Sequence, residues 1–191
     1  CAHFDPAMNL YPGAFSTPFR ERLLKLHEFT KHMHQFPNPS NFLQSFNNGS
    51  IVLKISDFKM KISKTVRNIS FDSYFNLELK PNALPGNLHT LKFGIMFDKE
   101  IKPDTLPDKL HTLKFGDHFN QEIQPNVLPD CLHTLWLGEY FDQEIKPKTI
   151  PDKLHTLRLG RDFNQKIKPD ALPDKLHTLE FGRNFNQEIK P

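Results

Sequence analysis

The sequence predicts a mainly β protein, a right-handed parallel β-solenoid of about six 22-residue coils with a small helical cap at its N-terminus. Three observations support this fold class. The tetrapeptide Leu-His-Thr-Leu recurs every 22 residues, at 88–91, 110–113, 132–135, 154–157 and 176–179. A proline closes each unit, at 103, 125, 147, 169 and 191. The chain holds 16 prolines, which exclude long helices because each removes a backbone donor and fixes φ.

Each unit has room for one short strand and one extended return segment. Leu91 and Phe93 face one side of the expected strand. Thr90 and Lys92 face the other side. A glycine then follows, where a turn needs φ freedom or a close backbone approach. Stacked coils would place parallel strands about 4.8 Å apart. The expected core columns are Leu88, Leu91, Phe93, Phe97, Ile101 and Leu106, with their equivalents in the other coils.

The repeats divide the chain into two expected domains, an N-terminal region at 1–61 and a solenoid at 62–191. The predicted coils are 62–83, which is degenerate, then 84–105, 106–127, 128–149, 150–171 and 172–191, which is incomplete. Residues 17–36 predict a helix, because Thr17 suits the N-cap and Pro18 the first turn. Residues 50–62 are strand-like, and helix and strands together would cap the first coil. Because the last coil stops part-way, we expect the natural protein to continue.

Composition and charge exclude several classes of function. No stretch reaches the roughly 18 apolar residues that a membrane span requires. Basic residues number 8 against 4 acidic ones in 1–65, and 17 against 18 in 66–191. Neither part therefore has the one-sided basic surface of a nucleic-acid-binding protein. The two cysteines, Cys1 and Cys131, lie in dissimilar contexts, which favours a reducing compartment and a cytoplasmic location.

The motif at 106–123, Leu-Pro-Asp-Lys-Leu-His-Thr-Leu-Lys-Phe-Gly-Asp-His-Phe-Asn-Gln-Glu-Ile, resembles the FNIP repeat. This leucine-rich-repeat-like family occurs in social amoebae and in giant viruses of amoebae. The resemblance covers about residues 62–191 and implies an LRR-like solenoid that binds other proteins, in the host cell cytoplasm if the chain is viral. Many viral members join such repeats to an F-box, which implies a substrate adaptor in ubiquitylation. Residues 1–61 show one helical pattern, whereas an F-box needs three helices.

Three repeated polar columns have both a chemical and a structural interpretation. The histidines could share a transition metal, but no second type of ligand accompanies them, so an exposed ladder or a hydrogen bond to the preceding turn is favoured. These are His89, His111, His133, His155 and His177. The column of Asn76, Asp98, Asn120, Asp142, Asn164 and Asn186 favours bonding to backbone groups over carboxylate chemistry. The threonine column that begins at Thr90 favours a cross-strand ladder.

The candidate binding surface consists of positions that vary while the scaffold repeats. The predicted protein-binding residues are Lys92, Lys114, His118, Trp136, Tyr140, Arg158 and Glu180. Trp136 is the single tryptophan of the chain, and an exposed aromatic ringed by charge is typical of a binding hot spot. The alternative is that Trp136 stacks on Lys114 and Arg158 and only covers the sheet.

Two functions remain open at this point. The first is a protein–protein interaction module that uses the strand side of the solenoid. The second is a structural scaffold with no specific partner. We expect no enzyme activity, cofactor, metal or small-molecule substrate, because no set of nucleophile, base or phosphate-binding glycines is present in the sequence.

Overall fold

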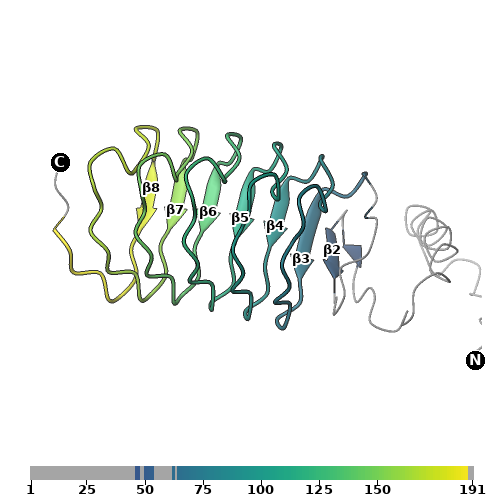
Figure 1. The fold of residues 1–191 in the computed structure, drawn as a ribbon, viewed down its shortest axis with the longest axis horizontal. Coiled ribbons are helices and arrows are strands. Elements are labelled where there is room, and N and C mark those ends of the chain that lie inside the picture. The colour runs from purple at the N-terminus through teal and green to yellow at the C-terminus, as the bar shows by residue number, and fades with distance from the viewer. Residues whose placement is uncertain (1–45, 48–49, 54–61, 63, 189–191) are drawn as a thin grey trace, which may run out of the picture. The chain divides into compact units, whose positions relative to one another are not determined.

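One continuous sheet of eight strands runs through the computed structural model, which describes residues 46–47, 50–53, 62 and 64–188. The strands are β1 (Phe46–Asn47), β2 (Ser50–Leu53), β3 (Asn68–Phe71), β4 (Thr90–Lys92), β5 (Thr112–Lys114), β6 (Thr134–Trp136), β7 (Thr156–Arg158) and β8 (Thr178–Glu180). Their order in the sheet follows the chain, and Figure 1 shows β3 to β8 side by side. β1 pairs with β2 in antiparallel fashion, and all later pairs are parallel. These strands belong to one compact unit, Asn41–Pro191.

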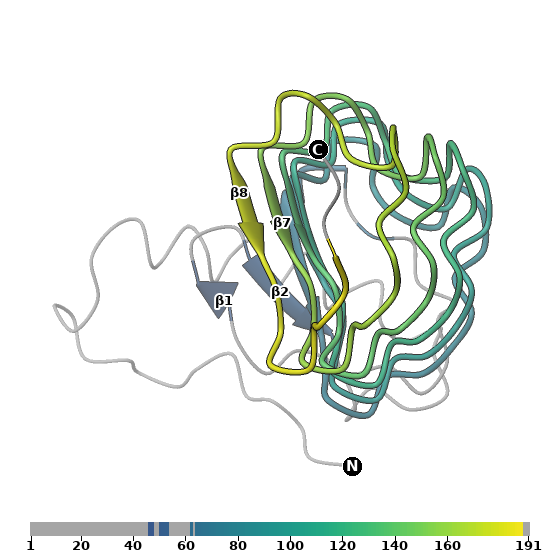
Figure 2. The same cartoon turned by 90° about the vertical axis from the view of Figure 1, so that its left-hand side faces the viewer.

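The strand register confirms the 22-residue coil. Thr90 pairs with Thr112, and every later threonine of the column pairs with its equivalent in the next coil. Strands β3 to β8 therefore mark about five complete turns of a leucine-rich-repeat-like solenoid. Viewed along the stack, the coils overlap, with strands on one side and return segments on the other (Figure 2). Within the described residues the return segments contain turns and no helix, as the two prolines per coil predict.

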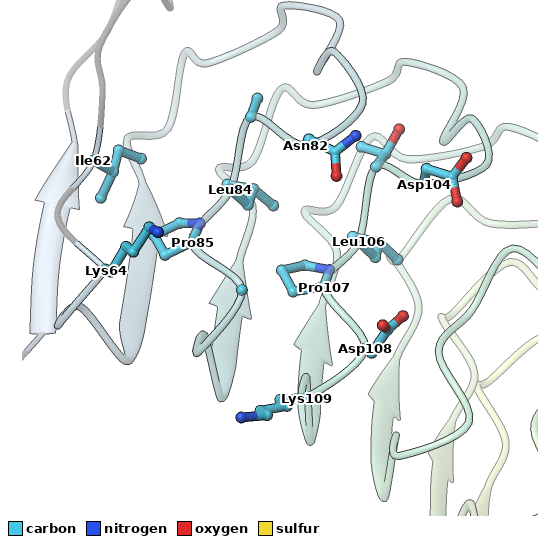
Figure 3. Close-up of a pocket in the computed structure, with 13 residues that line it drawn as sticks. Ile62, Lys64, Asn82, Leu84, Pro85, Asp104, Leu106, Pro107, Asp108 and Lys109 are labelled. Atoms are coloured by element: carbon cyan, nitrogen blue, oxygen red, sulfur yellow. The ribbon is translucent and has the colours of Figure 1, made fainter.

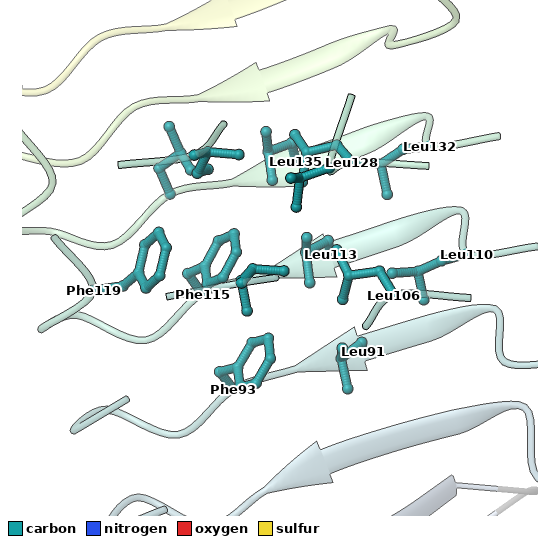
Figure 4. Close-up of a cluster of buried hydrophobic side chains, with 14 of the residues drawn as sticks. Leu91, Phe93, Leu106, Leu110, Leu113, Phe115, Phe119, Leu128, Leu132 and Leu135 are labelled. Atoms are coloured by element: carbon teal, nitrogen blue, oxygen red, sulfur yellow. The ribbon is translucent and has the colours of Figure 1, made fainter. Parts of the chain in front are cut away.

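The predicted core columns are buried. Leu88, Leu91 and Phe97 expose none of their surface. Figure 4 shows equivalent leucines and phenylalanines of neighbouring coils lying one above another. The rings of Phe97 and Phe119 are stacked with centroids 6.0 Å apart, and the ring of Phe141 follows at 6.1 Å. Burial of one such side chain stabilises the fold by roughly 1.5–3 kcal/mol, so each coil depends on its neighbours for its stability.

The glycine that follows each strand is required by close backbone approach. A Cβ added at Gly116 would lie 1.8 Å from the carbonyl oxygen of Gly94, the equivalent residue of the preceding coil. At Gly160 the distance to the carbonyl oxygen of Gly138 would be 1.7 Å. No side chain fits at such distances, so the column admits glycine alone. Of the two reasons that the sequence suggested for this glycine, the structure supports the contact between coils.

A second backbone requirement falls on the residue after each closing proline. This residue is left-handed in five successive coils, at Asn82 (φ 59°), Asp104 (60°), Asn126 (62°), Lys148 (64°) and Asp170 (62°). Asparagine and aspartate tolerate this conformation best among residues with a Cβ. Lys148 is the exception in the column, because a lysine adopts this conformation less readily.

The Asn/Asp column bonds to the backbone, although across coils rather than within its own turn. The side-chain oxygen of Asn76 accepts the backbone N–H of Asp98 at 3.0 Å, and that of Asp98 accepts the N–H of Asn120 at 3.0 Å. Each later member continues the pattern with its counterpart 22 residues on. Because only an oxygen acceptor at this point is needed, Asn and Asp are interchangeable here.

The predictions for the N-terminal region concern residues that lie partly outside the described ones. The strand-like segment at 50–62 does form β2 at Ser50–Leu53, and β2 extends the sheet beside β3. The predicted helix at 17–36 lies outside the described residues. The division of the chain at residue 61 and the role of 1–61 as a cap therefore stay predictions.

Candidate functional site

The outward positions of the short strands form one row across the sheet, here called the strand-face row. It consists of Lys92, Lys114, Trp136, Arg158 and Glu180, each the register partner of the next. Parallel pairing in register therefore places five of the seven predicted binding residues side by side. The strands present them because Leu91 and its equivalents face the core, and the next residue along a strand must face out.

Trp136 lies half-buried between two cations. The Lys114 Nζ atom lies 2.8 Å from the centroid of the Trp136 ring, and the Arg158 Cζ atom lies 5.1 Å from it. Arg158 also contacts Glu180, with 3.4 Å between Nε and Oε2. The stacking that the covering alternative predicted is thus present. It leaves the tryptophan in a fixed position with part of its surface accessible to solvent.

The remaining two predicted residues lie on a neighbouring edge, here called the rim, which is made by the two positions after each glycine. His118 and Tyr140 meet edge to face with ring centroids 5.0 Å apart. Arg161 lies over the Tyr140 ring, with its Cζ atom 5.1 Å from the ring centroid. The rim segments stack through backbone hydrogen bonds, such as that from the Tyr140 N–H to the Asp117 carbonyl at 2.9 Å.

Sequence reasoning left three exposed rim residues out of the predicted site. Tyr74 exposes 87% of its surface, Ile95 46% and Met96 40%, against 39% for Tyr140. Ile95 and Met96 occupy the same two positions as Glu139 and Tyr140, and Tyr74 stands 22 residues before Met96. The signal was therefore available in the repeat alignment. It was missed because the prediction followed the charged residues around Trp136.

The electrostatics of the strand-face row differ from those of the return segments. Partial burial, then the neighbouring charges of Lys92 and Arg158, hold the pKa of Lys114 below its ordinary value. On the return side the lysines have carboxylate partners from the preceding coil, as in Lys102–Glu78 at 2.5 Å and Lys168–Glu144 at 2.6 Å. Among the described residues, Lys92 and Lys114 thus have no carboxylate at ion-pair distance, whereas Lys102, Lys146 and Lys168 each have one.

The histidine column forms a ladder of rings in which the first three rings stack and the later ones meet edge to face. His89 and His111 stack with ring centroids 4.7 Å apart, and His111 and His133 follow at 5.1 Å. The Nδ1–H group of His111 donates to the Lys109 carbonyl at 2.7 Å. The pKa of His89 is lowered, first by burial and then by the charges of His111 and Arg67. Among the described residues, no three His, Cys, Asp or Glu side chains converge as metal ligands.

A pocket of about 680 Å³ lies along the Leu-Pro turns that precede β4 and β5 (Figure 3). The turns at Leu84–Pro85 and Leu106–Pro107 line it, together with the buried Thr105. Charged side chains of both signs also line it, namely Lys64, Lys109, Asp104 and Asp108. Because these charges offset one another, the pocket presents no distinct preference for a charged ligand, and the strand side remains the stronger candidate.

The stacked parallel strands, the repeated core columns and the variable outer row define a leucine-rich-repeat-like solenoid. The FNIP repeat model matches residues 56–95, 97–140, 141–184 and 163–191. The chain therefore belongs to the FNIP repeat family, as its 22-residue motif indicated.

One solved structure that is similar is CroV588, a giant-virus protein described as a novel circular LRR protein. It shares 36% sequence identity with this chain at a TM-score of 0.69. The match covers 78% of this chain, which spans about a quarter of the length of CroV588 (24%). No curated protein matches the chain significantly. Within the described residues no helix has the length and apolar character needed to cross a membrane.

Proposed function

We propose that the chain is a protein–protein interaction module that binds its partner through the strand side of the solenoid, around Trp136 and Tyr140. The observation that carries this proposal is the strand-face row itself. The five coils from residue 84 on repeat their core, their glycine and their closing proline, yet the outward strand position changes in nature along the row. A surface that varies on an unvarying scaffold is what recognition of one particular partner requires.

The fixed position of Trp136 supports the same proposal. Lys114 and Arg158 hold its ring by stacking, so little conformational freedom would be lost when a partner covers it. Tryptophan and tyrosine dominate binding hot spots because they bring a large contact area at a small entropic cost. Tyr140, held by Arg161 and His118, supplies a second anchor on the adjacent rim.

Capture of partners by the full chain tests the proposal. The variant Trp136→Ala should lose at least about 30-fold in affinity for the partner that the wild type retains, as expected for a hot-spot residue. The matched control is Lys168→Ala, which alters an exposed ion pair on the return side. Circular dichroism should show the same fold for both variants. Equal retention of the partner by wild type and Trp136→Ala would contradict the proposal.

The structural scaffold remains the second candidate, because the cation–Trp stack also serves to cover the sheet. On that interpretation Trp136→Ala would lower stability and change no interaction. A role as substrate adaptor in ubiquitylation, in the cytoplasm of the cell or of a viral host, is a finer form of the first proposal. Its support is the family resemblance. Its test is whether ubiquitin-ligase subunits co-purify with the full-length protein and whether the partner's ubiquitylation depends on Trp136.

A further inference from the structure

We propose that the segment bound at the strand-face row is an acidic peptide segment of the partner protein, a proposal that rests on the function proposed above. The row carries three cations on four successive strands, Lys92, Lys114 and Arg158, with Trp136 among them. Within the residues that the structure describes, no carboxylate lies at ion-pair distance from Lys92 or Lys114, and Arg158 has the one contact to Glu180.

Lysines on the return side of the same solenoid have carboxylate partners within the chain. On the return side the ammonium groups of Lys102, Lys146 and Lys168 each reach a glutamate of the preceding coil. The chain therefore has a means of neutralising basic residues between coils, and of the three cations in the row only Arg158 uses it, through Glu180. Like charges on adjacent strands destabilise a sheet, so an uncompensated row has a cost that a partner's carboxylates would remove.

The pKa of Lys114 is consistent with this arrangement. It is lowered first by partial burial and then by Lys92 and Arg158, so the ammonium group experiences the positive field of its neighbours. An acidic segment laid along the row would place its carboxylates near Lys92, Lys114 and Arg158 in turn, because neighbouring strands of the sheet lie about 4.8 Å apart. Lys114 and Arg158 are already ordered by stacking on the tryptophan ring, so a carboxylate would meet prepositioned donors.

The surroundings of the row favour a peptide over a nucleic acid. Asp117 and Glu139 stand on the rim of the same coils that carry Lys114 and Trp136, and Glu180 ends the row. A phosphate backbone needs a basic track that continues along many nucleotides, whereas the three cations occupy four strands and Glu180 ends the row. The exposed Ile95 and Met96 next to the row offer apolar contacts that suit the side chains of a protein.

A peptide-display selection on the full chain tests the inference. A random peptide library is selected on the immobilised wild type and counter-selected on Trp136→Ala. Enrichment of peptides rich in Asp and Glu supports the inference. Enrichment of neutral or basic peptides overturns it and leaves the proposed recognition function intact. No enrichment over the Trp136→Ala control overturns both the inference and the recognition function.

The enriched peptide then permits a quantitative test. Its affinity should fall about tenfold for the double variant Lys114→Gln/Arg158→Gln, and it should fall with added salt. The matched control is Lys102→Gln/Lys168→Gln on the return side, which should stay within about twofold. A fluorescent single-stranded oligouridylate serves as the competing probe. Tighter binding of this RNA than of the selected peptide would overturn the acidic-peptide assignment in favour of nucleic acid.

Discussion

The strand side and the return side of the solenoid use the same basic residue types in opposite ways. On the return side, lysines stand one coil after glutamates and pair with them, as Lys146 pairs with Glu122. On the strand side, Lys92, Lys114 and Arg158 accompany Trp136 with little compensation. The return-side pairs are exposed, so each contributes little to stability. The difference teaches that the return side repeats its ion pairs from coil to coil, whereas the strand side keeps Lys92 and Lys114 without a carboxylate partner among the described residues.

The two sides also differ in how much they repeat. The return side reproduces its hydrogen bonds from coil to coil, with an Asn or Asp oxygen accepting the next backbone N–H each time. The strand-face row changes residue type along its length, from lysine to tryptophan to arginine to glutamate. Stability should therefore respond mainly to the repeated positions, and binding mainly to the variable ones.

The largest effect is expected where the strand side passes into the return side, at Gly116. Its substitution by alanine places a Cβ 1.8 Å from the Gly94 carbonyl oxygen, so two backbones must move apart. We expect Gly116→Ala to lower the free energy of unfolding by about 3 kcal/mol or more, measured by urea denaturation. The control is Gly86→Ala, where no atom lies within 4 Å of the added Cβ, and its effect should stay within about 0.5 kcal/mol. Equal stability of the two variants would disprove the close-approach explanation.

A smaller loss is expected from the return side alone. Asp98→Ala removes the oxygen that accepts the Asn120 backbone N–H at 3.0 Å and the Gln121 amide at 2.9 Å. The expected cost is about 1–2 kcal/mol in the free energy of unfolding. Asp98→Asn keeps the oxygen acceptor and should behave as the wild type does. If the asparagine variant lost as much stability as the alanine variant, charge rather than the hydrogen bond would account for the column.

The smallest effect concerns pH, and it separates the two sides. Burial, then the charge of His111, lowers the pKa of His89 from its ordinary value of 6.5, so the unfolded chain takes up a proton first and stability starts to fall as the pH drops below about 6.5. On the return side, hydrogen bonds from Lys102 and Lys146 lower the pKa values of Glu78 and Glu122 from 4.5. That contribution is present above pH 4.5 and is lost as the pH falls through the lowered values.

Melting temperatures recorded between pH 8 and pH 3 check this prediction. The variant His89→Gln should reduce the loss that begins near pH 6.5, and Glu122→Gln should reduce the loss below pH 4.5. Each variant should leave the other loss unchanged. A melting temperature that stays constant between pH 7 and pH 5 in the wild type would contradict the assignment to the histidine ladder.

The repeat made much of the fold predictable. The equal spacing of six positions predicted six core columns, which are buried. The alternation at the end of Leu-His-Thr-Leu predicted the short strands and the residues that face outward from them. What sequence could not supply was the geometry between coils. Whether the glycine served a turn or a close approach depended on how near Gly94 comes to Gly116. The hydrogen bond that Asp98 accepts from the Asn120 backbone N–H, 22 residues later, depends on the same distance between coils.

The candidate site was predictable to a similar depth. Parallel register placed Lys114, Trp136 and Arg158 together, as the shared column required. The cation–Trp stack that the covering alternative predicted is present, and partner binding at the same ring stays a prediction. The exposed Tyr74 was missed because the prediction followed the charged residues around Trp136, although the 22-residue spacing places Tyr74 in one column with Met96 and Tyr140.

The glycine column has a consequence for how such a chain can change in length. Each carbonyl lies where the next coil's missing side chain would be, so inserting one residue between two of these glycines lengthens one 22-residue interval and strains that one contact. Duplication or deletion of a whole 22-residue segment leaves every carbonyl above a glycine. The solenoid can thus lengthen or shorten in complete modules, and its strand-face row would gain or lose one strand at a time.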